Sequence, residues 1–171
     1  SRATPEGREE RPGPVQLNRL VQTALPLVAH QYSLRGVHLC CQLDPALPQV
    51  LGVEAQLQQV LMSLLANAFD ANRAHEEPRQ RRILLTTSGA GAWALLSVRD
   101  EGPGFSDEQL ARLFTPFVSG KPQGQGTGLG LSVSYGIISD HGGALEAFNR
   151  AEGGAELRVT LPAQVPADAT G

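Results

Sequence analysis

Apolar residues recur at helical spacing in three parts of the chain. One pattern begins at Pro14, one runs from Glu54 to Ala74, and one follows Gly130 and ends near His141. The middle pattern is the most regular and predicts an amphipathic helix that packs against a core. Its apolar stripe consists of Leu57, Val60, Leu61, Leu64, Leu65 and Ala68.

The first helical pattern contains a proline and is followed by a glycine. Pro26 lacks the amide hydrogen that a helix interior needs, so we expect a kink or break near Leu25. Gly36 marks the end of the segment, because glycine readily adopts the left-handed conformation that ends helices. The pattern therefore predicts a helix that is kinked or broken near its middle.

Five shorter segments are rich in β-forming residues and are separated by turn-forming ones. They span residues 37–43, 83–87, 92–98, 144–148 and 156–161. The turn at Gly89 to Gly91 predicts a hairpin between the second and the third. Ser106 is suited to cap a short helix that runs through Leu113. Together these elements predict an α/β fold, a two-layer α/β sandwich with the helices on one face of a mixed sheet.

The length of 171 residues is enough for one domain with its own core. We expect residues 14–162 to form it, after a polar, disordered lead-in at 1–13 and before a tail at 163–171. The net charge of −3 gives no general reason to expect nucleic-acid binding. No apolar run approaches the span of a bilayer and no signal peptide is visible, so we expect a cytoplasmic domain without direct membrane contact of its own, and leave open a membrane-anchored parent protein.

Cys40 and Cys41 are adjacent in the sequence. In an extended strand their side chains point to opposite faces, which places them poorly for a mutual disulfide. The sequence contains no Cys-x-x-Cys pair or Cys/His cluster that would indicate zinc. We therefore expect two reduced cysteines, one of them packed in the core.

The stretch from Gly120 to His141 joins a glycine-rich loop, with five glycines up to Gly130, to the start of a helix. Glycine lets the backbone approach a ligand closely, and the unpaired N–H groups at a helix start suit phosphate. A Walker loop places its lysine after the glycines, whereas Lys121 precedes most of them. A dinucleotide loop lies early in a βαβ unit, whereas this one lies late in the chain. Both common phosphate loops fit poorly, and a surface loop without a ligand is the alternative.

Three polar residues, Ser63, Asn67 and Asp70, lie about one turn apart along the flank of the helix at 54–74. An asparagine amide oxygen is a hard, neutral ligand that suits Mg²⁺, although a polar residue on a helix flank can also serve only to face water. Asp100 ends a strand within DEGPGF, where its carboxylate can accept a hydrogen bond from an amine or simply form a turn.

Four patches follow one another in a fixed order: Asn67 in LLANAFDA, Asp100 in DEGPGF, the aromatic segment LFTPF, and GTGLGL. This order resembles the N, G1, F and G2 boxes of sensor histidine kinases. These kinases belong to the ATPase superfamily shared with gyrase, the ninety-kilodalton heat-shock chaperone and the mismatch-repair protein MutL. The chain is most similar to the nitrogen-regulatory type, which carries NLLxNAxDA, PFFTTKPxGxGTGLGLS and DHGG. The resemblance covers roughly Pro14 to Leu161 and implies the Bergerat ATP-binding fold, a mixed, mostly antiparallel sheet with about three helices on one face.

The resemblance implies a site for ATP and Mg²⁺ in which Asn67 and Lys121 carry the catalysis. Asn67 would hold the magnesium ion, Asp100 would accept a hydrogen bond from the adenine amine, and Lys121 would reach the β- or γ-phosphate. Gly102 and Gly104 would let the backbone pass close to the base. The other nucleotide-binding residues implied are Asp70, Gly126, Thr127, Gly128, Leu129, Gly130 and Thr160.

Two residues depart from the family pattern. Ser63 stands where kinases of this type usually have a second asparagine and where hydrolytic members usually have a glutamate. Serine is no base at neutral pH, which argues against efficient ATP hydrolysis and leaves phosphotransfer open. Gly120 replaces a usual threonine in the lid, which the resemblance places at Thr115 to Thr127 with Phe114 and Phe117 at its hinge.

The family's phosphoacceptor histidine lies on a separate dimerisation domain, in an H-E-x-x-N-P-like motif that this chain lacks. His75 precedes a glutamate but lies in a charged segment directly after the asparagine helix, where we expect a solvated loop. His141 matches the DHGG helix end, where a partly charged imidazole would favour the helix dipole. The chain is therefore expected to be the catalytic and ATP-binding domain of a larger kinase.

The resemblance implies that this domain binds Mg-ATP and transfers the γ-phosphoryl group to a histidine on the dimerisation domain, from which a response regulator takes it. Three alternatives stay open: a serine kinase of the anti-sigma-factor type, an ATP-driven conformational clamp like gyrase, and a nucleotide-binding interaction module without catalysis. Phosphohistidine is acid-labile and phosphoserine is not, so acid stability of the product separates the first alternative from the main hypothesis.

Overall fold

A five-stranded sheet forms one layer of the protein. The computed structural model describes residues 11–73, 81–115 and 127–164, with 127–130 as backbone only. Across the sheet the strands are β2 (Val37–Gln42), β4 (Arg81–Ala90), β5 (Trp93–Arg99), β7 (Ala155–Pro162) and β6 (Ala144–Asn149). β2 pairs in parallel with β4, and every other pairing in this sheet is antiparallel. The predicted mixed, mostly antiparallel sheet is confirmed, as is the β4–β5 hairpin.

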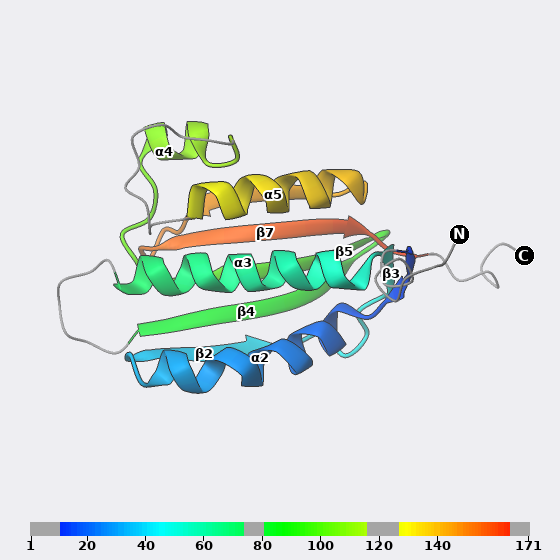
Figure 1. Ribbon diagram of the computed structural model, residues 1–171, viewed down its shortest axis with the longest axis horizontal. Helices are drawn as coiled ribbons and strands as arrows, with labels where there is room; N and C mark the ends of the chain where they lie inside the picture. Colours follow the sequence, from blue (N-terminus) through cyan, green and yellow to red (C-terminus); the bar gives the residue numbers. More distant parts are fainter. Residues whose placement is uncertain (1–10, 74–80, 116–126, 165–171) are drawn as a thin grey trace, which may run out of the picture.

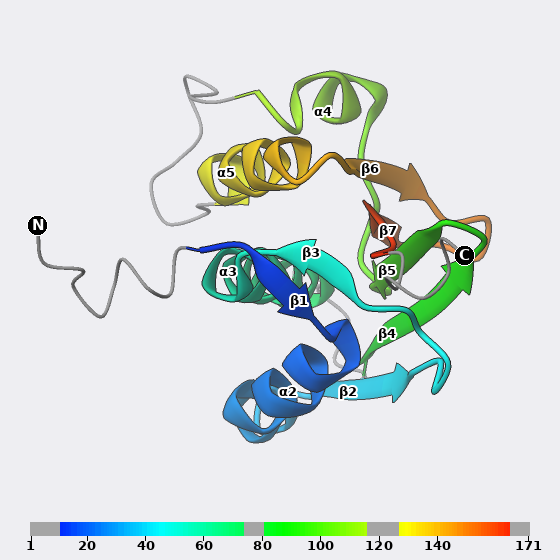
Figure 2. The ribbon, with the colours of Figure 1, turned by 90° about the vertical axis from the view of Figure 1, so that its right-hand side faces the viewer.

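Three helices cover one face of this sheet, as Figures 1 and 2 show. They are α2 (Leu17–Ser33), α3 (Glu54–Arg73) and α5 (Thr127–Asp140). Alternate residues of β7 are buried beneath them, and Val159 and Leu161 line a small apolar gap with Leu57 of α3 and Ile138 of α5. Burial of this alternating set explains why the strand adopts one register, since a slip by one residue would turn its apolar side chains to water. The predicted two-layer sandwich is confirmed.

The short helix α4 (Asp107–Arg112) stands apart from the three core helices at the top of Figure 1. Ser106 caps it as predicted: its hydroxyl accepts from the backbone N–H of Gln109 at 3.0 Å, and the Gln109 side chain accepts from the Ser106 N–H at 2.8 Å. This reciprocal capping box satisfies two N–H groups that the helix start would otherwise leave open.

A second, two-stranded sheet lies at the end of the molecule where the chain enters the fold. β1 (Gly13–Val15) pairs antiparallel with β3 (Val50–Gly52). Ala163 bridges to Val50, and the Gln164 N–H donates to the Gln49 carbonyl at 2.7 Å, so the chain remains paired past the predicted boundary at residue 162. Three-residue strands have no alternation long enough to detect, and for that reason the sequence did not predict β1 or β3.

Two local features differ from what the sequence suggested. Of the predicted kink or break near Leu25, the break is absent: α2 continues from Leu17 to Ser33 through Pro26, because packing of its buried residues outweighs the loss of one hydrogen bond. Cys40 and Cys41 are unbonded and both exposed, whereas one was expected in the core. β2 is an edge strand, and the helix layer covers only its first half, so the alternation that buries Val37 does not reach Cys41. None of the helices in the described ranges combines the length and hydropathy that crossing a bilayer requires.

Candidate functional site

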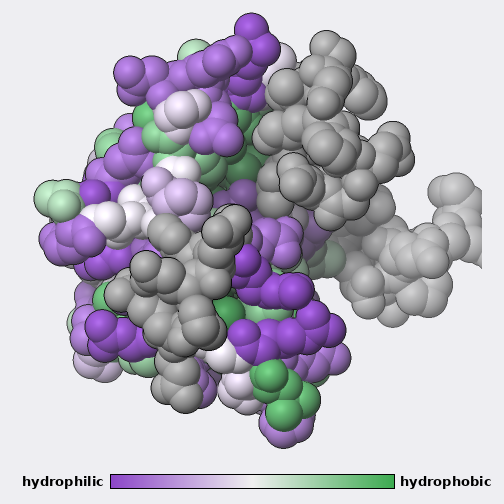
Figure 3. Space-filling model, turned by 90° about the vertical axis from the view of Figure 1, so that its left-hand side faces the viewer, coloured by the Kyte–Doolittle hydropathy of each residue, from purple (hydrophilic) through white to green (hydrophobic). Residues whose placement is uncertain are grey.

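Four chain segments that are far apart in sequence meet at one end of the molecule. The C-terminal turns of α3, the end of β5, the start of β7 and the start of α5 all lie at the left of Figure 1. Figure 3 views this end, where the described surface is mostly hydrophilic with small apolar areas. Because α3 and β5 run toward this end while α5 and β7 run away from it, the fold brings Asn67 and Asp100 to the same region as the helix start at Thr127.

Asn67 lies on α3 with only 6% of its surface exposed. Its amide oxygen Oδ1 is buried and has no hydrogen-bond partner among the described residues. An unpartnered buried oxygen costs about 1–3 kcal/mol, so an oxygen in this state is a site at which a ligand or ion restores the lost interaction. The side chain therefore fits the predicted role as a magnesium ligand.

No group of three or more His, Cys, Asp or Glu side chains within the described ranges is arranged to hold a metal ion. A single amide oxygen does not form a complete metal cage. Magnesium usually keeps several waters and is bound through one or two protein oxygens together with substrate phosphates. Asn67 therefore suits a metal that arrives with a nucleotide rather than one held by the protein alone.

Asp100 follows β5 directly and is 3% exposed. Its Oδ1 accepts two backbone N–H bonds, from Gly102 at 2.9 Å and from Ala155 at 3.1 Å. The Asp100 N–H in turn donates to the Ala155 carbonyl at 2.9 Å. These bonds fix the carboxylate to its own loop and to the first residue of β7, so its orientation does not depend on a ligand.

Gly102 and Gly104 are required by the packing of the loop that follows Asp100. A Cβ atom at Gly102 would lie 2.5 Å from the backbone oxygen of Ala71. Ala71 is one turn beyond Asn67 on α3, so this close approach brings the loop to the helix face that carries Asn67. Gly104 adopts φ +77°, and a Cβ there would lie 2.8 Å from Oδ1 of Asn149. Neither position accepts a side chain without displacement of the loop.

The turn between β6 and β7 also holds the loop, and the sequence did not identify its residues as part of the site. The Asn149 side chain accepts from the Phe105 N–H and donates to the Phe105 carbonyl, both at 2.7 Å. Arg150 Nη1 donates to the Asp100 carbonyl at 2.7 Å. Gly154 adopts φ +87° directly against Asp100. The paired glycines Gly153 and Gly154 were the signal that could have indicated a close backbone approach.

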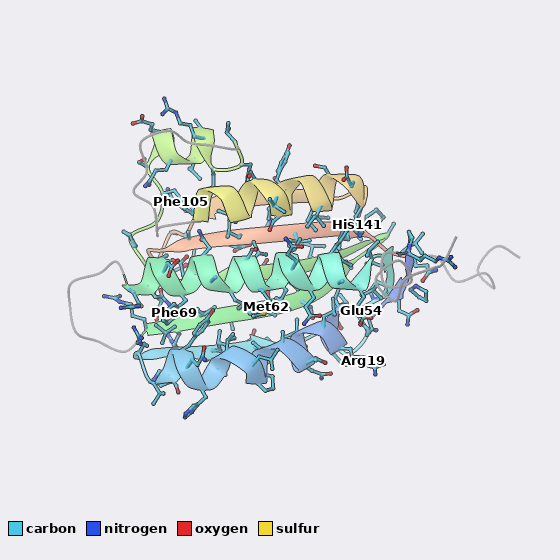
Figure 4. The ribbon with its side chains drawn as sticks, in the orientation of Figure 1. Arg19, Glu54, Met62, Phe69, Phe105 and His141 are labelled. Carbon is cyan, nitrogen blue, oxygen red and sulfur yellow. The ribbon has the colours of Figure 1, made fainter. Side chains whose placement is uncertain are left out.

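Asp70 is exposed on α3, one turn beyond Asn67. Burial of part of the carboxyl group raises the pKa of Asp70, and the charge of Arg73 opposes this rise. The aromatic ring of Tyr32 stacks on that of Phe69, with the ring centroids 4.2 Å apart. Burial, and to a smaller extent the negative charge of Asp70, raises the pKa of Tyr32. Figure 4 labels Phe69 at this end of α3, between the helix and α2.

Thr160 does not lie with the other predicted site residues. Thr160 pairs with Leu95 of β5, whereas Asp100 follows Arg99, the last residue of β5, which pairs with Glu156. At roughly 3.3 Å per residue, the two residue pairs are about 13 Å apart along the strands. Its neighbours Val159 and Leu161 face the core, so Thr160 points to the opposite, helix-free face of the sheet. The residue of β7 that meets Asp100 is Ala155.

The predicted lid and much of the glycine loop lie outside the described residues. These include Lys121, Gly126, Phe117 and Gly120, together with His75. α5 begins at Thr127, so the backbone of Thr127, Gly128, Leu129 and Gly130 forms the predicted helix start. At the other edge of the lid segment, Phe114 stacks on Tyr135 of α5 with the centroids 5.2 Å apart.

His141 lies at the opposite end of α5, far from Phe105, as Figure 4 shows. Its Nε2 accepts from the Val53 N–H at 3.0 Å, and its Nδ1 lies 2.7 Å from the Ile137 carbonyl. Because Nε2 accepts, Nδ1 is the nitrogen that faces the carbonyl as a donor. The ring links the C-terminus of α5 to the residue that precedes α3.

An ionic cluster lies beside Asp100 on the helix-free face of the sheet. Glu156 of β7 accepts from Arg99 at 2.8 Å, from Arg158 at 2.9 Å and from Ser97 at 3.1 Å. Burial alone would raise the pKa of Glu156, but the hydrogen bonds and charges of the two arginines outweigh it, so the pKa is lowered. The cluster joins β5 to β7 immediately next to the Asp100–Ala155 contact.

We expect Glu156→Gln to lower the melting temperature near neutral pH. A lowered folded-state pKa contributes stability that is present above the unfolded value of 4.5 and is lost as the pH falls through the folded pKa. The difference from the wild-type melting temperature should therefore shrink as the pH falls below 4.5. Glu146→Gln, at an exposed position of β6 opposite Arg158, is the matched control and should leave the melting temperature near neutral pH close to that of wild type. A difference for Glu156→Gln that stays constant with pH would contradict this account.

The sequence and the fold are both similar to known proteins. The family model described as "Histidine kinase-, DNA gyrase B-, and HSP90-like ATPase" matches residues 52–165. The C4-dicarboxylate transport sensor protein DctB of Pseudomonas aeruginosa is 35% identical over 165 residues, which cover 96% of this chain and 27% of that protein. The sensor histidine kinase ZraS of Escherichia coli is 34% identical over 151 residues, which cover 88% of this chain and 31% of that protein. The chain thus spans less than a third of the length of either relative.

Solved structures share the fold. The nucleotide-free catalytic domain of histidine kinase ThkA has a TM-score of 0.78 at 28% identity, over 90% of this chain and 96% of that one. Full-length ShkA in complex with AMPPNP has a TM-score of 0.75 at 29% identity, over 91% of this chain and 32% of that one. ThkA in complex with the response regulator TrrA has a TM-score of 0.73 at 25% identity, over 90% of this chain and 42% of that one.

Proposed function

Because this chain belongs to the family of histidine kinase-, DNA gyrase B- and HSP90-like ATPases, we propose that it is the ATP-binding catalytic domain of a sensor histidine kinase. In this proposal it binds ATP and Mg²⁺ and transfers the γ-phosphoryl group to a histidine on a dimerisation domain of a longer parent protein. A response regulator then accepts the group. The domain acts on the cytoplasmic side, where ATP is available, and needs no nucleic acid and no direct membrane contact.

The unpartnered Oδ1 of Asn67 is the observation that carries this proposal. It is buried on the helix face against which the Asp100 loop packs, and the contact between Ala71 and Gly102 connects the two. Asn67 would hold the magnesium ion, and Asp100 would accept from the adenine amine. The AMPPNP complex of ShkA and the response-regulator complex of ThkA support the nucleotide and the partner by similarity.

The chemistry asked of this domain is positioning and charge neutralisation. In the transfer, a histidine nitrogen of the partner domain forms a bond to the γ-phosphorus while the bond to the β–γ bridging oxygen breaks, and that oxygen leaves with ADP. A bound magnesium ion supplies positive charge to the phosphate oxygens. The N–H groups at the start of α5 and Lys121 would contribute further, and Asn67 would orient the nucleotide relative to them.

A hydrolytic function like that of gyrase fits the site less well. Ser63 occupies the position one turn before Asn67 on α3, and a serine hydroxyl does not act as a base on water at neutral pH. Phosphotransfer needs no such base on this domain. Serine kinase activity is distinguished by the acid stability of the phosphorylated product.

We expect the Asp100→Asn variant to bind a non-hydrolysable ATP analogue at least about tenfold more weakly than wild type. Asparagine keeps one oxygen for the N–H groups of Gly102 and Ala155. The NH₂ group of asparagine, however, replaces the second carboxylate oxygen, so an N–H donor stands where the proposal needs an acceptor for the adenine amine. Calorimetry of the 171-residue chain with Mg²⁺ measures the change.

The base specificity supplies the control for this experiment. Because the introduced amide can donate to the O6 of guanine, the preference for the ATP analogue over the GTP analogue should narrow in Asp100→Asn. Thr160→Ala, which lies outside the site, should leave both affinities unchanged. Wild-type affinity for the ATP analogue in Asp100→Asn would remove Asp100 from the site.

A further inference from the structure

Asn72, near the end of α3, is a buried residue that connects three parts of the site. It is 2% exposed. Its Oδ1 accepts from the Glu101 N–H at 2.7 Å, and its Nδ2 donates to the Arg82 carbonyl at 3.1 Å. One side chain thus joins the last turn of α3, the loop after Asp100 and the first residues of β4.

Glu101 is the residue directly after Asp100, and each of its polar groups has a partner. Its N–H donates to Asn72, its carbonyl accepts from Arg81 Nη1 at 3.2 Å, and its carboxylate accepts from the Arg82 N–H at 2.5 Å. Of these bonds, only the one that the Glu101 N–H donates to Asn72 reaches the helix that carries Asn67. It is therefore the polar link between Glu101 and that helix, beside the packing of Gly102 on Ala71.

We propose that Asn72 is a positioning residue for nucleotide binding, which holds the Asp100–Gly104 loop against α3 and thereby sets the separation between Asp100 and Asn67. The proposal rests on the proposed function. Asn72 acts through the Glu101 N–H and does not itself touch the nucleotide. Gly102 packs on Ala71, the residue before Asn72, so loss of the Asn72 bond would leave that close contact without a polar anchor on the helix side.

Asn18 provides a matched control because it has the same side chain in the same kind of bridge. Its Nδ2 donates to the Asp44 carbonyl at 2.7 Å, and its Oδ1 accepts from the Thr87 hydroxyl at 2.7 Å. It lies next to Arg19, which Figure 4 labels at the end of the molecule opposite Phe69. Removal of either side chain costs two hydrogen bonds, but only the loss at Asn72 reaches the site.

The test is calorimetric titration of the 171-residue chain with ADP, together with thermal unfolding of each variant. We expect Asn72→Ala to bind ADP about tenfold more weakly and Asn18→Ala to bind it as wild type does, although both variants melt at lower temperature. Wild-type ADP affinity in folded Asn72→Ala would overturn the proposal. If the wild-type chain itself fails to bind ADP, the proposed function fails instead.

Asn72→Asp keeps the test decisive if Asn72→Ala does not fold. Aspartate retains an acceptor for the Glu101 N–H but loses the donor to Arg82. Adenosine is the probe for this variant, because it carries no phosphate charge that the new carboxylate would repel. We expect its affinity to stay within about threefold of wild type. A tenfold or greater loss of adenosine affinity would show that binding depends on the bond from Asn72 to the Arg82 carbonyl rather than on the bond from the Glu101 N–H to Asn72. That result would overturn the proposal.

Discussion

Replacement of Asn67 by alanine is expected to lower magnesium-dependent binding of an ATP analogue by on the order of 100-fold and to abolish phosphorylation in the longer kinase. Its Oδ1 is the only buried side-chain oxygen among the described residues of α3 that has no hydrogen-bond partner. Under the proposed function, its removal takes away the oxygen that would bind magnesium. Titrations with and without Mg²⁺ separate this loss from any loss of nucleotide affinity that does not depend on the metal.

Although Asn67→Ala should weaken binding, we do not expect it to lower the stability of the unliganded domain. A buried oxygen without a partner is a cost to the unliganded fold, so Asn67→Ala should leave the free energy of unfolding unchanged or raise it by about 1 kcal/mol. Urea unfolding without nucleotide measures this. Asn72→Ala, which removes two satisfied hydrogen bonds five residues away, should lower the free energy of unfolding. Phosphorylation at the wild-type level in Asn67→Ala would exclude the proposed metal role.

Replacement of Gly154 by alanine is expected to destabilise the domain by at least about 3 kcal/mol and to weaken adenine-nucleotide binding. Gly154 adopts φ +87°, and an added Cβ would lie 2.1 Å from the Asp100 carbonyl oxygen and 2.9 Å from its carbonyl carbon. Both atoms belong to backbone, so no side-chain rotation relieves the overlap. The turn must move away from Asp100, which disrupts the contact that orients the carboxylate.

Gly153 is the control for this substitution. It has a similarly positive φ of +99°, but an added Cβ there has no heavy atom within 4 Å. Gly153→Ala should therefore show only the backbone strain, about 1–2 kcal/mol, with nucleotide affinity unchanged. Equal losses of stability and of affinity in the two variants would mean that the contact with Asp100 has no effect of its own.

The sequence contained the main groups of the site because each belongs to a local pattern. Asn67 follows from the stripe of an amphipathic helix, Asp100 from a strand that ends in a glycine-containing turn, and the helix start at Thr127 from glycines before an apolar period. Each of these signals is complete within a dozen residues. The four patches in order identified the family, and the fold class followed from the same helix and strand patterns.

The errors and omissions all depended on which segments lie side by side. The resemblance to the ATPase superfamily implied a nucleotide-binding role for Thr160 in the last strand, but strand register puts Ala155 beside Asp100. Asn72 and Asn149 are ordinary polar residues in the sequence, and only the packed structure shows that both hold the loop after Asp100. The predicted break at Pro26 is absent because the packing of α2 decided the outcome. The cysteine expected in the core is exposed because β2 is an edge strand.

By itself, the sequence determined the family and the elements other than β1 and β3, and it predicted which residues are suited to bind Mg-ATP, because periodicity and composition act over short distances along the chain. The tertiary structure alone decided that Asn67 keeps an unpartnered oxygen and that Gly154 and Asn72 fix the loop of Asp100. Contacts between residues 29 to 55 positions apart, such as those of Glu101 with Asn72 and of Asp100 with Ala155, depend on register and close packing, which no local pattern specifies.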